Sequence, residues 1–293
     1  MKTNSCWALK LMNKPTSRLD LSSISPMKFS QMKLSEIINI DIFDGNILRK
    51  LGDFFQVKLV KNKNLPFNLK GKIIDVKNLL DEPCLAFYGD LSMVDNLGKN
   101  MKGGRIFVFG NIGNYVGVSM NRGYIEINGS AGLHTGCAMT GGFLNILKDV
   151  GDFSAGALPG QLQGVTGGVL FIHGCVGKNF GNLMRRGLAV ISKNAGNYLA
   201  YRMIAGTIAI GGNVGEHCGY GMKRGTLVFS KFKPDIPSTF ITTNHDFSSF
   251  WGILSAELKL YGKPFLTLEK KKISRVVGDI AFGGKGEWLF CDD

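Results

Sequence analysis

Residues 98–110 read GKNMKGGRIFVFG, and this stretch decides the fold. Its pattern, G-x-x-M-x-x-G-x-I-x-V-x-G, returns along the chain with a period of 19 residues. A β-α-β crossover needs about 30 residues, so 19 residues allow only one coil of short strands and tight turns. Successive coils would stack in parallel roughly 4.8 Å apart. The sequence therefore predicts an all-β fold, a right-handed parallel β-helix of about seven to eight coils.

Two columns of residues carry the period, one of methionine and one of glycine. Val165 takes the methionine place once, and apolar pairs such as Ile106 and Val108 alternate after the glycine, as in a strand. We expect the methionines to fill the core and the glycines to form corners where a Cβ would clash. The columns are Met101, Met120, Met139, Met184, Met203 and Met222, and Gly104, Gly123, Gly142, Gly168, Gly187, Gly206 and Gly225.

The repeat divides the chain into three parts. Residues 1–84 lack the period and predict a small α/β cap over the N-terminal end of the stack. Residues 85–230 form the solenoid. Residues 231–293 contain a helical pattern over 246–260, expected to pack over the last coil, and a tail, 276–290, that crosses back or clasps a neighbour.

One insertion interrupts the regular spacing. It lies near residues 156–164, GALPGQLQG, and adds seven residues to one period. An irregular loop on a rigid stack is a good place for recognition, so Leu158 and Pro159 are candidate contacts with a partner. The alternative is an insertion that the fold merely tolerates.

A basic column is the second candidate surface. Arg122, Arg186 and Arg224 each precede a corner glycine, and Arg185 and Lys223 lie beside the last two. The formal net charge of +13 also favours an acidic partner. Such a ladder fits an acidic subunit or a polycarboxylate ligand. The alternative is an ordinary solvated face.

The sequence offers no catalytic or metal-binding constellation. The six cysteines include no C-x-x-C pair, and His134 and His217 occupy one column about 19 Å apart, too far to share a metal. A carbohydrate-active enzyme would need clustered carboxylates, and a nucleic-acid binder a contiguous basic strip with aromatic residues. We expect no catalytic residue, cofactor or metal in this chain, no nucleic-acid or membrane partner, and a cytoplasmic location.

The repeat resembles that of the C-subunit family of formylmethanofuran dehydrogenases. The same repeat is similar to the C-terminal β-helix of glutamate synthase large subunits. Segments 156–160 (GALPG), 184–187 (MRRG), 203–207 (MIAGT) and 222–228 (MKRGTLV) look closest to the C subunit of the bacterial formyltransferase/hydrolase complex of methylotrophs. The resemblance covers nearly the whole chain.

The resemblance implies a structural subunit within an enzyme complex. That complex would pass a formyl group from tetrahydromethanopterin to a methanofuran-type carrier and hydrolyse it to formate. Its other subunits would be an amidohydrolase-like A chain, a pterin-oxidoreductase-like B chain and a formyltransferase D chain, with zinc, or in relatives tungsten or molybdenum, held outside this chain. The alternatives are a glutamate-synthase-like structural domain and the C subunit of an archaeal tungsten or molybdenum dehydrogenase of methanogenesis.

Overall fold

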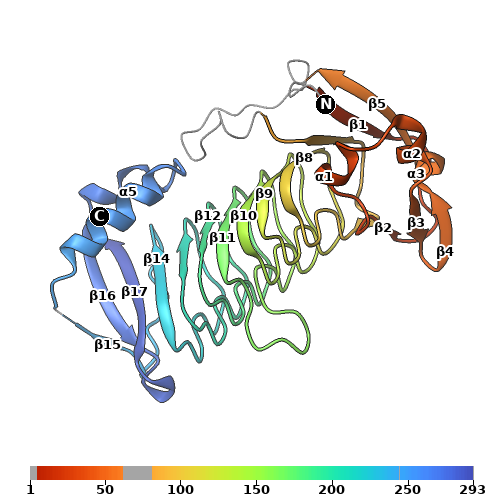
Figure 1. Ribbon diagram of the computed structural model, residues 1–293. Coiled ribbons are helices and arrows are strands. Elements are labelled where there is room, and N and C mark those ends of the chain that lie inside the picture. The colour runs from red at the N-terminus through yellow and green to blue at the C-terminus, as the bar shows by residue number, and fades with distance from the viewer. Residues whose placement is uncertain (1–4, 62–80, 244, 293) are drawn as a thin grey trace.

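The computed structural model describes residues 5–61, 81–243 and 245–292, and its fold is mostly β, as predicted. One sheet contains 13 strands, in the order β15-β16-β17-β14-β13-β12-β11-β10-β9-β8-β6-β1-β5 (Figure 1). Its central pairs are all parallel. The central strands are β6 (Cys84–Tyr88), β8 (Lys102–Phe109), β9 (Arg122–Ile127), β10 (Thr140–Ile146), β11 (Gly167–Ile172), β12 (Leu188–Ile191), β13 (Thr207–Ile210) and β14 (Arg224–Phe229).

Each repeat supplies one strand to this sheet, and equivalent residues of successive repeats lie side by side. Ile106 pairs with Ile125, and Ile125 pairs with Leu144, each 19 residues further along. The return segments between the strands are also joined, by parallel bridges through Ala131, Val150, Val176, Ala195 and Val214. The period of the sequence is therefore the spacing of neighbours in space.

An apolar core fills the space between the inner face of the sheet and the return segments. The six methionines of the column are at most 1% exposed, and Val165, in the same column, is fully buried. The outer face of the sheet is also covered in its C-terminal half. There Phe171, Val190 and Val228 pack against helix α5 (Ser248–Lys259) and the 3-10 helix η2 (Phe265–Lys270).

The glycine columns are required for two different reasons. Gly123 has a φ of +101°, and an added Cβ would lie 2.6 Å from the carbonyl oxygen of Gly104 in the preceding coil. Gly132 has ordinary backbone angles, but its Cβ would lie 2.8 Å from the carbonyl oxygen of Gly113. The first column therefore needs both left-handed backbone and close approach, and the second needs close approach alone.

The cap at the N-terminal end combines short strands and helices. Strand β1 (Ser5–Leu11) extends the large sheet by pairing in parallel with β6 and antiparallel with β5 (Phe55–Lys61). A second sheet has four strands in the order β4-β3-β2-β7. Its strands are β2 (Leu19–Asp20), β3 (Asp41–Asp44), β4 (Ile47–Lys50) and β7 (Val94–Asp95), and the cap helices are α1 (Pro26–Phe29), α2 (Leu34–Ile38) and α3 (Leu51–Phe54). Residues 62–80 of the predicted cap lie outside the described residues.

The C-terminal part extends one prediction. Helix α5 covers more than the last coil, because it lies across the outer face of the sheet, over strands from several coils (Figure 1). The tail crosses back, because β17 (Lys285–Asp292) pairs in parallel with β14 and antiparallel with β16 (Lys272–Gly278). The remaining elements are β15 (Ile241–Thr242) and η3 (Ile280–Phe282). No helix in the described ranges has both the length and the apolar content to cross a membrane.

In the N-terminal cap, the Asp44 side chain holds the loop at Thr16 and Ser17 in place. This contact gives a pH-dependent prediction. Its carboxylate accepts hydrogen bonds from the Thr16 hydroxyl at 2.7 Å and the Ser17 N–H at 2.8 Å, which lower the pKa of Asp44. A lowered folded-state pKa stabilises the fold above the unfolded value of about 3.9. That contribution is lost as the pH falls through the folded-state pKa.

We therefore expect Asp44→Ala to lower the free energy of unfolding by about 1–3 kcal/mol at pH 7. The difference from wild type should shrink below about pH 4, because the carboxyl is protonated first in the unfolded chain and only at lower pH in the folded protein. Urea denaturation of both proteins at pH 7 and pH 3 measures it. An equal difference at both pH values would contradict the assignment.

Candidate interaction surfaces

The basic column runs across the large sheet at the end where the parallel strands begin, and its side chains are exposed. Arg122 begins β9 and is in register with Lys102 of the preceding coil. Arg224 begins β14 and is in register with Lys285 of β17, so the column extends one coil further than the sequence indicates. Arg186 is exposed between these ends. Within the described ranges, none of the five basic side chains predicted from the sequence forms an ion pair.

The insertion projects from the stack between two anchored ends. Ala157 donates its N–H to the Asn182 carbonyl at 3.0 Å, and Gly164 donates to the Leu183 carbonyl at 2.8 Å. Between these anchors Leu158 is half-buried and Pro159 is exposed. The most exposed apolar side chain of the loop is Leu162, at 89%, which the sequence did not single out. Leu162 therefore joins Leu158 and Pro159 as a candidate contact, because loops on a rigid scaffold often carry recognition.

A hydrogen bond joins the two candidate surfaces. Arg185 donates from Nη1 to the Oε1 atom of Gln163 in the insertion, at 2.7 Å. Arg185 is therefore a side chain that positions the insertion, whereas its neighbour Arg186 makes no such contact. Lys223 and Arg224 follow two coils further along and are exposed. The insertion and the basic column thus meet at Arg185.

A column of aromatic side chains, which the sequence analysis missed, occupies one corner of the stack. Tyr115 stacks on His134 with ring centres 4.9 Å apart, and His134 stacks on Phe153 at 5.5 Å. Further along, Tyr198 stacks on His217 at 4.8 Å. All five have positive φ, between 56° and 60°. Burial lowers the pKa of His134, so this imidazole is a neutral stacking group at neutral pH rather than a cation.

Four polar side chains form a buried chain on the outer face of the sheet. The Tyr124 hydroxyl donates to the Glu126 carboxylate, and Asn145 Nδ2 donates to the same oxygen at 3.1 Å. His173 Nε2 lies 3.0 Å from Asn145 Oδ1. Burial raises the pKa of Tyr124 and lowers that of His173. Since these groups pair with one another, the arrangement explains their burial without a catalytic role.

Five of the six cysteines are buried, and Cys175 is half-buried. Burial raises the pKa of Cys137 to about 12, and it also raises the pKa of Cys6 and of Cys218. A thiol with a raised pKa is a poor nucleophile and a poor metal ligand at neutral pH. In the part of the chain that the structure describes, no three His, Cys, Asp or Glu side chains are grouped so that they could hold a metal ion.

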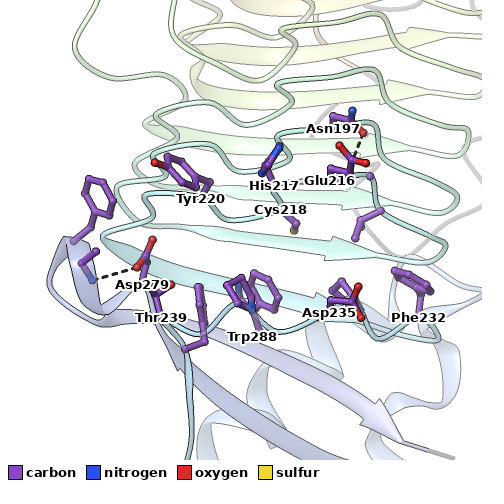
Figure 2. Close-up of a pocket in the computed structure, with 17 residues that line it drawn as sticks. Asn197, Glu216, His217, Cys218, Tyr220, Phe232, Asp235, Thr239, Asp279 and Trp288 are labelled. Carbon is purple, nitrogen blue, oxygen red and sulfur yellow. Dashed lines mark hydrogen bonds between the residues drawn. The ribbon is translucent and has the colours of Figure 1, made fainter.

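A cavity of about 680 Å³ opens at the C-terminal end of the stack. One wall is the return segment of the last coil, with Glu216, His217 and Cys218 (Figure 2). The opposite wall includes Asp235 and Asp279. This cavity could not be predicted from the repeat, because its second wall comes from residues outside it.

No family model matches the chain, and its matches to curated relatives are partial. The C subunit of the tungsten-containing formylmethanofuran dehydrogenase 2 of Methanothermobacter thermautotrophicus is 34% identical over 103 residues, 35% of this chain and 33% of that relative. The C subunit of the molybdenum-containing formylmethanofuran dehydrogenase 1 of Methanothermobacter marburgensis is 31% identical over 99 residues, 34% of this chain and 20% of that relative. The chain spans a third or less of these relatives' length.

A solved structure matches over the full length. It is the crystal structure of the formyltransferase/hydrolase complex (FhcABCD) of Methylorubrum extorquens in complex with methylofuran. One of its chains matches with a TM-score of 0.83 and 32% identity, covering 98% of this chain and 100% of that chain. Such similarity in both sequence and structure across whole chains indicates common descent, which a shared fold alone would not. This chain therefore belongs to the C-subunit family of formylmethanofuran dehydrogenases.

Proposed function

We propose that this chain is a structural, non-catalytic subunit of a cytoplasmic formyltransferase/hydrolase complex in one-carbon metabolism. The observation that carries the proposal is the match, at 32% identity over 98% of the chain, to a chain of the solved FhcABCD complex. The candidate surfaces support it, because they are exposed basic, apolar and aromatic side chains without the paired acid and base that chemistry requires.

The proposal includes the path of the backbone. The repeats would wind as a right-handed parallel β-helix of about seven to eight coils, each with one strand in the large sheet and one return segment. Connections between parallel strands of one sheet are right-handed in about 98% of cases, which supports this hand. Bridges between successive return segments support the stacking of complete coils.

The proposed companions are an amidohydrolase-like A chain, a pterin-oxidoreductase-like B chain and a formyltransferase D chain. Together they would transfer a formyl group from tetrahydromethanopterin to a methanofuran-type carrier and release formate. Any zinc, tungsten or molybdenum would lie in those chains. The solved relative is a complex with methylofuran, which fits a carrier of this kind.

A second candidate is the C subunit of an archaeal dehydrogenase that holds tungsten or molybdenum. It is favoured by the 34% identity to the tungsten-containing relative. It ranks second, because that match covers 35% of this chain and the match to the formyltransferase/hydrolase complex covers 98%.

Affinity purification of the tagged full chain from its own host tests the proposal. We expect three companion chains in equal amounts, and formate release from a formyl carrier by the assembly. The chain expressed alone should show no turnover. A chain that purifies alone and has its own catalytic activity would refute the proposal, and companions that hold tungsten or molybdenum would favour the second candidate.

The basic column should contribute to assembly through charge. We expect Arg186→Glu/Arg224→Glu to weaken the affinity for the companions about 10-fold, and more strongly at low salt, because reversed charges repel an acidic surface. Its free energy of unfolding should change by less than about 0.5 kcal/mol, since both side chains are exposed.

A matched control is Lys148→Glu/Lys193→Glu, which changes the net charge equally at exposed positions away from the column. Affinity measured by biolayer interferometry at two salt concentrations compares the variants. Equal losses for both double variants would mean that net charge matters and the column does not.

A further inference from the structure

The last coil of the stack ends in an unpaired backbone edge. Within residues 5–61, 81–243 and 245–292, the N–H groups of Val214 and His217 have no hydrogen-bond acceptor. The carbonyl groups of Val214 and Cys218 likewise have no donor there. Val214 is half-buried and His217 is exposed, so the edge can be reached from solvent. Two donors and two acceptors are thus left in one row.

The preceding coil shows how the same positions are used when another coil follows. Two of its N–H groups donate to the next coil, and two of its carbonyls accept from it. These bonds run from Ala195 N–H to Asn213 O (2.9 Å), Tyr198 N–H to Glu216 O (2.8 Å), Gly215 N–H to Ala195 O (3.0 Å) and Gly219 N–H to Leu199 O (2.8 Å). The last coil therefore presents the pattern that a further coil would satisfy.

Side chains of the preceding coil also accept hydrogen bonds from the next coil. Asn194 Oδ1 accepts from the N–H of Asn213 at 2.9 Å, and Asn197 Oδ1 accepts from the N–H of Glu216 at 3.1 Å. The side chains of Asn213 and Glu216 occupy the equivalent places one coil further on, and both are exposed. Each carries an oxygen that could accept from the N–H of an added segment.

The chain itself satisfies only one end of this edge. Asp279 Oδ2 accepts from the N–H of Gly221 at 3.4 Å, in the place of the carbonyl that a further coil would supply. Strand β17 provides the next strand of the sheet, but among the described residues no further return segment bridges to Val214 beyond Ala195. Across the cavity lie Pro234 and Pro237, which have no N–H to offer. The cavity of about 680 Å³ is therefore the space of a missing return segment.

We infer that this edge binds an extended segment of a companion chain, which adds to the stack as one further return segment. Addition of a strand to an open edge draws its affinity from main-chain hydrogen bonds and its specificity from side-chain pockets. This inference rests on the proposed function, because it needs a companion chain.

The charge of the cavity specifies the segment further. The lining includes Glu216, Asp235 and Asp279 but no lysine or arginine, although the whole chain carries +13. The occupant is therefore a cationic segment. A second copy of this chain fits poorly, because pairing two identical edges would bring these carboxylates against their own copies.

Hydrogen exchange of the full chain, alone and in its purified complex, tests the inference. In the isolated chain the amides of Val214 and His217 should exchange without protection, and in the complex at least about 10-fold more slowly. Equal exchange in both samples, with the complex intact, overturns the inference and leaves the proposed function standing. Failure to form any complex overturns both.

Two variants identify the contact. Val214→Pro removes an N–H that has no acceptor among the described residues, so it should keep the fold and weaken companion binding about 10-fold. Ala195→Pro removes the bonded N–H one coil earlier and should destabilise the fold itself. Even if Val214→Pro does not fold, exchange protection in the wild-type complex shows whether this edge binds a companion segment.

The charge variant separates a cationic segment from other occupants. Glu216→Lys/Asp235→Lys should weaken binding about 10-fold, whereas the control Asp246→Lys/Glu257→Lys, with the same charge change at exposed positions, should not. Equal losses overturn the cationic occupant. A photocrosslinker at Thr239 should join the cavity wall to a companion chain, and a crosslink to a second copy of this chain overturns the inference.

Discussion

Gly168→Ala is expected to lower the free energy of unfolding by about 3–5 kcal/mol, from one added methyl group. Gly168 has a φ of +89°, and its Cβ would lie 2.7 Å from the carbonyl oxygen of Gly142 and 2.8 Å from the carbonyl carbon of Gly141. Both are backbone atoms of the neighbouring coil, which cannot rotate away as a side chain can. Relief requires β10 and β11 to separate, and that weakens their shared hydrogen bonds.

Gly160→Ala is the matched control. Gly160 has a similar φ, +82°, but no heavy atom lies within 4 Å of its Cβ position, in the insertion. It should lose only the cost of left-handed backbone, about 1–2 kcal/mol. Urea denaturation followed by circular dichroism compares the two. Equal losses would show that φ alone determines the effect and that close stacking does not.

The fold of the repeat could be predicted because its signal is local and recurs. Each column, such as the one through Met120 and Met139, has the same residue type in the same environment in several repeats. One position that departs from the pattern therefore does not prevent the prediction of the fold. Ala200 illustrates this: it stands at the position where other repeats have Gly117, Gly136, Gly181 and Gly219, and it keeps a φ of 58°, close to their 61° to 72°. Stacking with a fixed register then follows from the period, as the pairing of Ile125 with Leu144 shows.

The rest could not be predicted, because it depends on contacts that occur once. The apolar stripe of α5 indicated that one face is buried, but not that it would lie against Phe171 and Val190 on the outer face. The bond from Arg185 to Gln163 joins a repeat position to the insertion. The aromatic corner did have a sequence signal, a ring at Tyr115, His134 and Phe153 at 19-residue spacing, but L-residues rarely adopt positive φ, so a corner was not expected there.

Trp288 is the side chain that closes the open end of the core, and Trp288→Ala should lower the free energy of unfolding by about 3–5 kcal/mol. It is 1% exposed, and its ring packs 4.5 Å from that of Phe240 and 5.5 Å from that of Phe229. Its Nε1 donates to the Met222 sulfur at 3.4 Å, which joins it to the last member of the methionine column. Loss of the ring would leave a cavity at this end of the core.

Phe282→Ala is the control, because Phe282 lies at the same end but is 41% exposed, so its loss should cost less than about 1 kcal/mol. Thermal unfolding and light scattering measure both variants. Trp288→Ala should also self-associate, because a stack whose end is not covered presents apolar surface and unpaired backbone to other copies. If it stays monomeric and as stable as wild type, β17 closes the stack through its backbone pairing with β14, and the tryptophan ring is not needed for it.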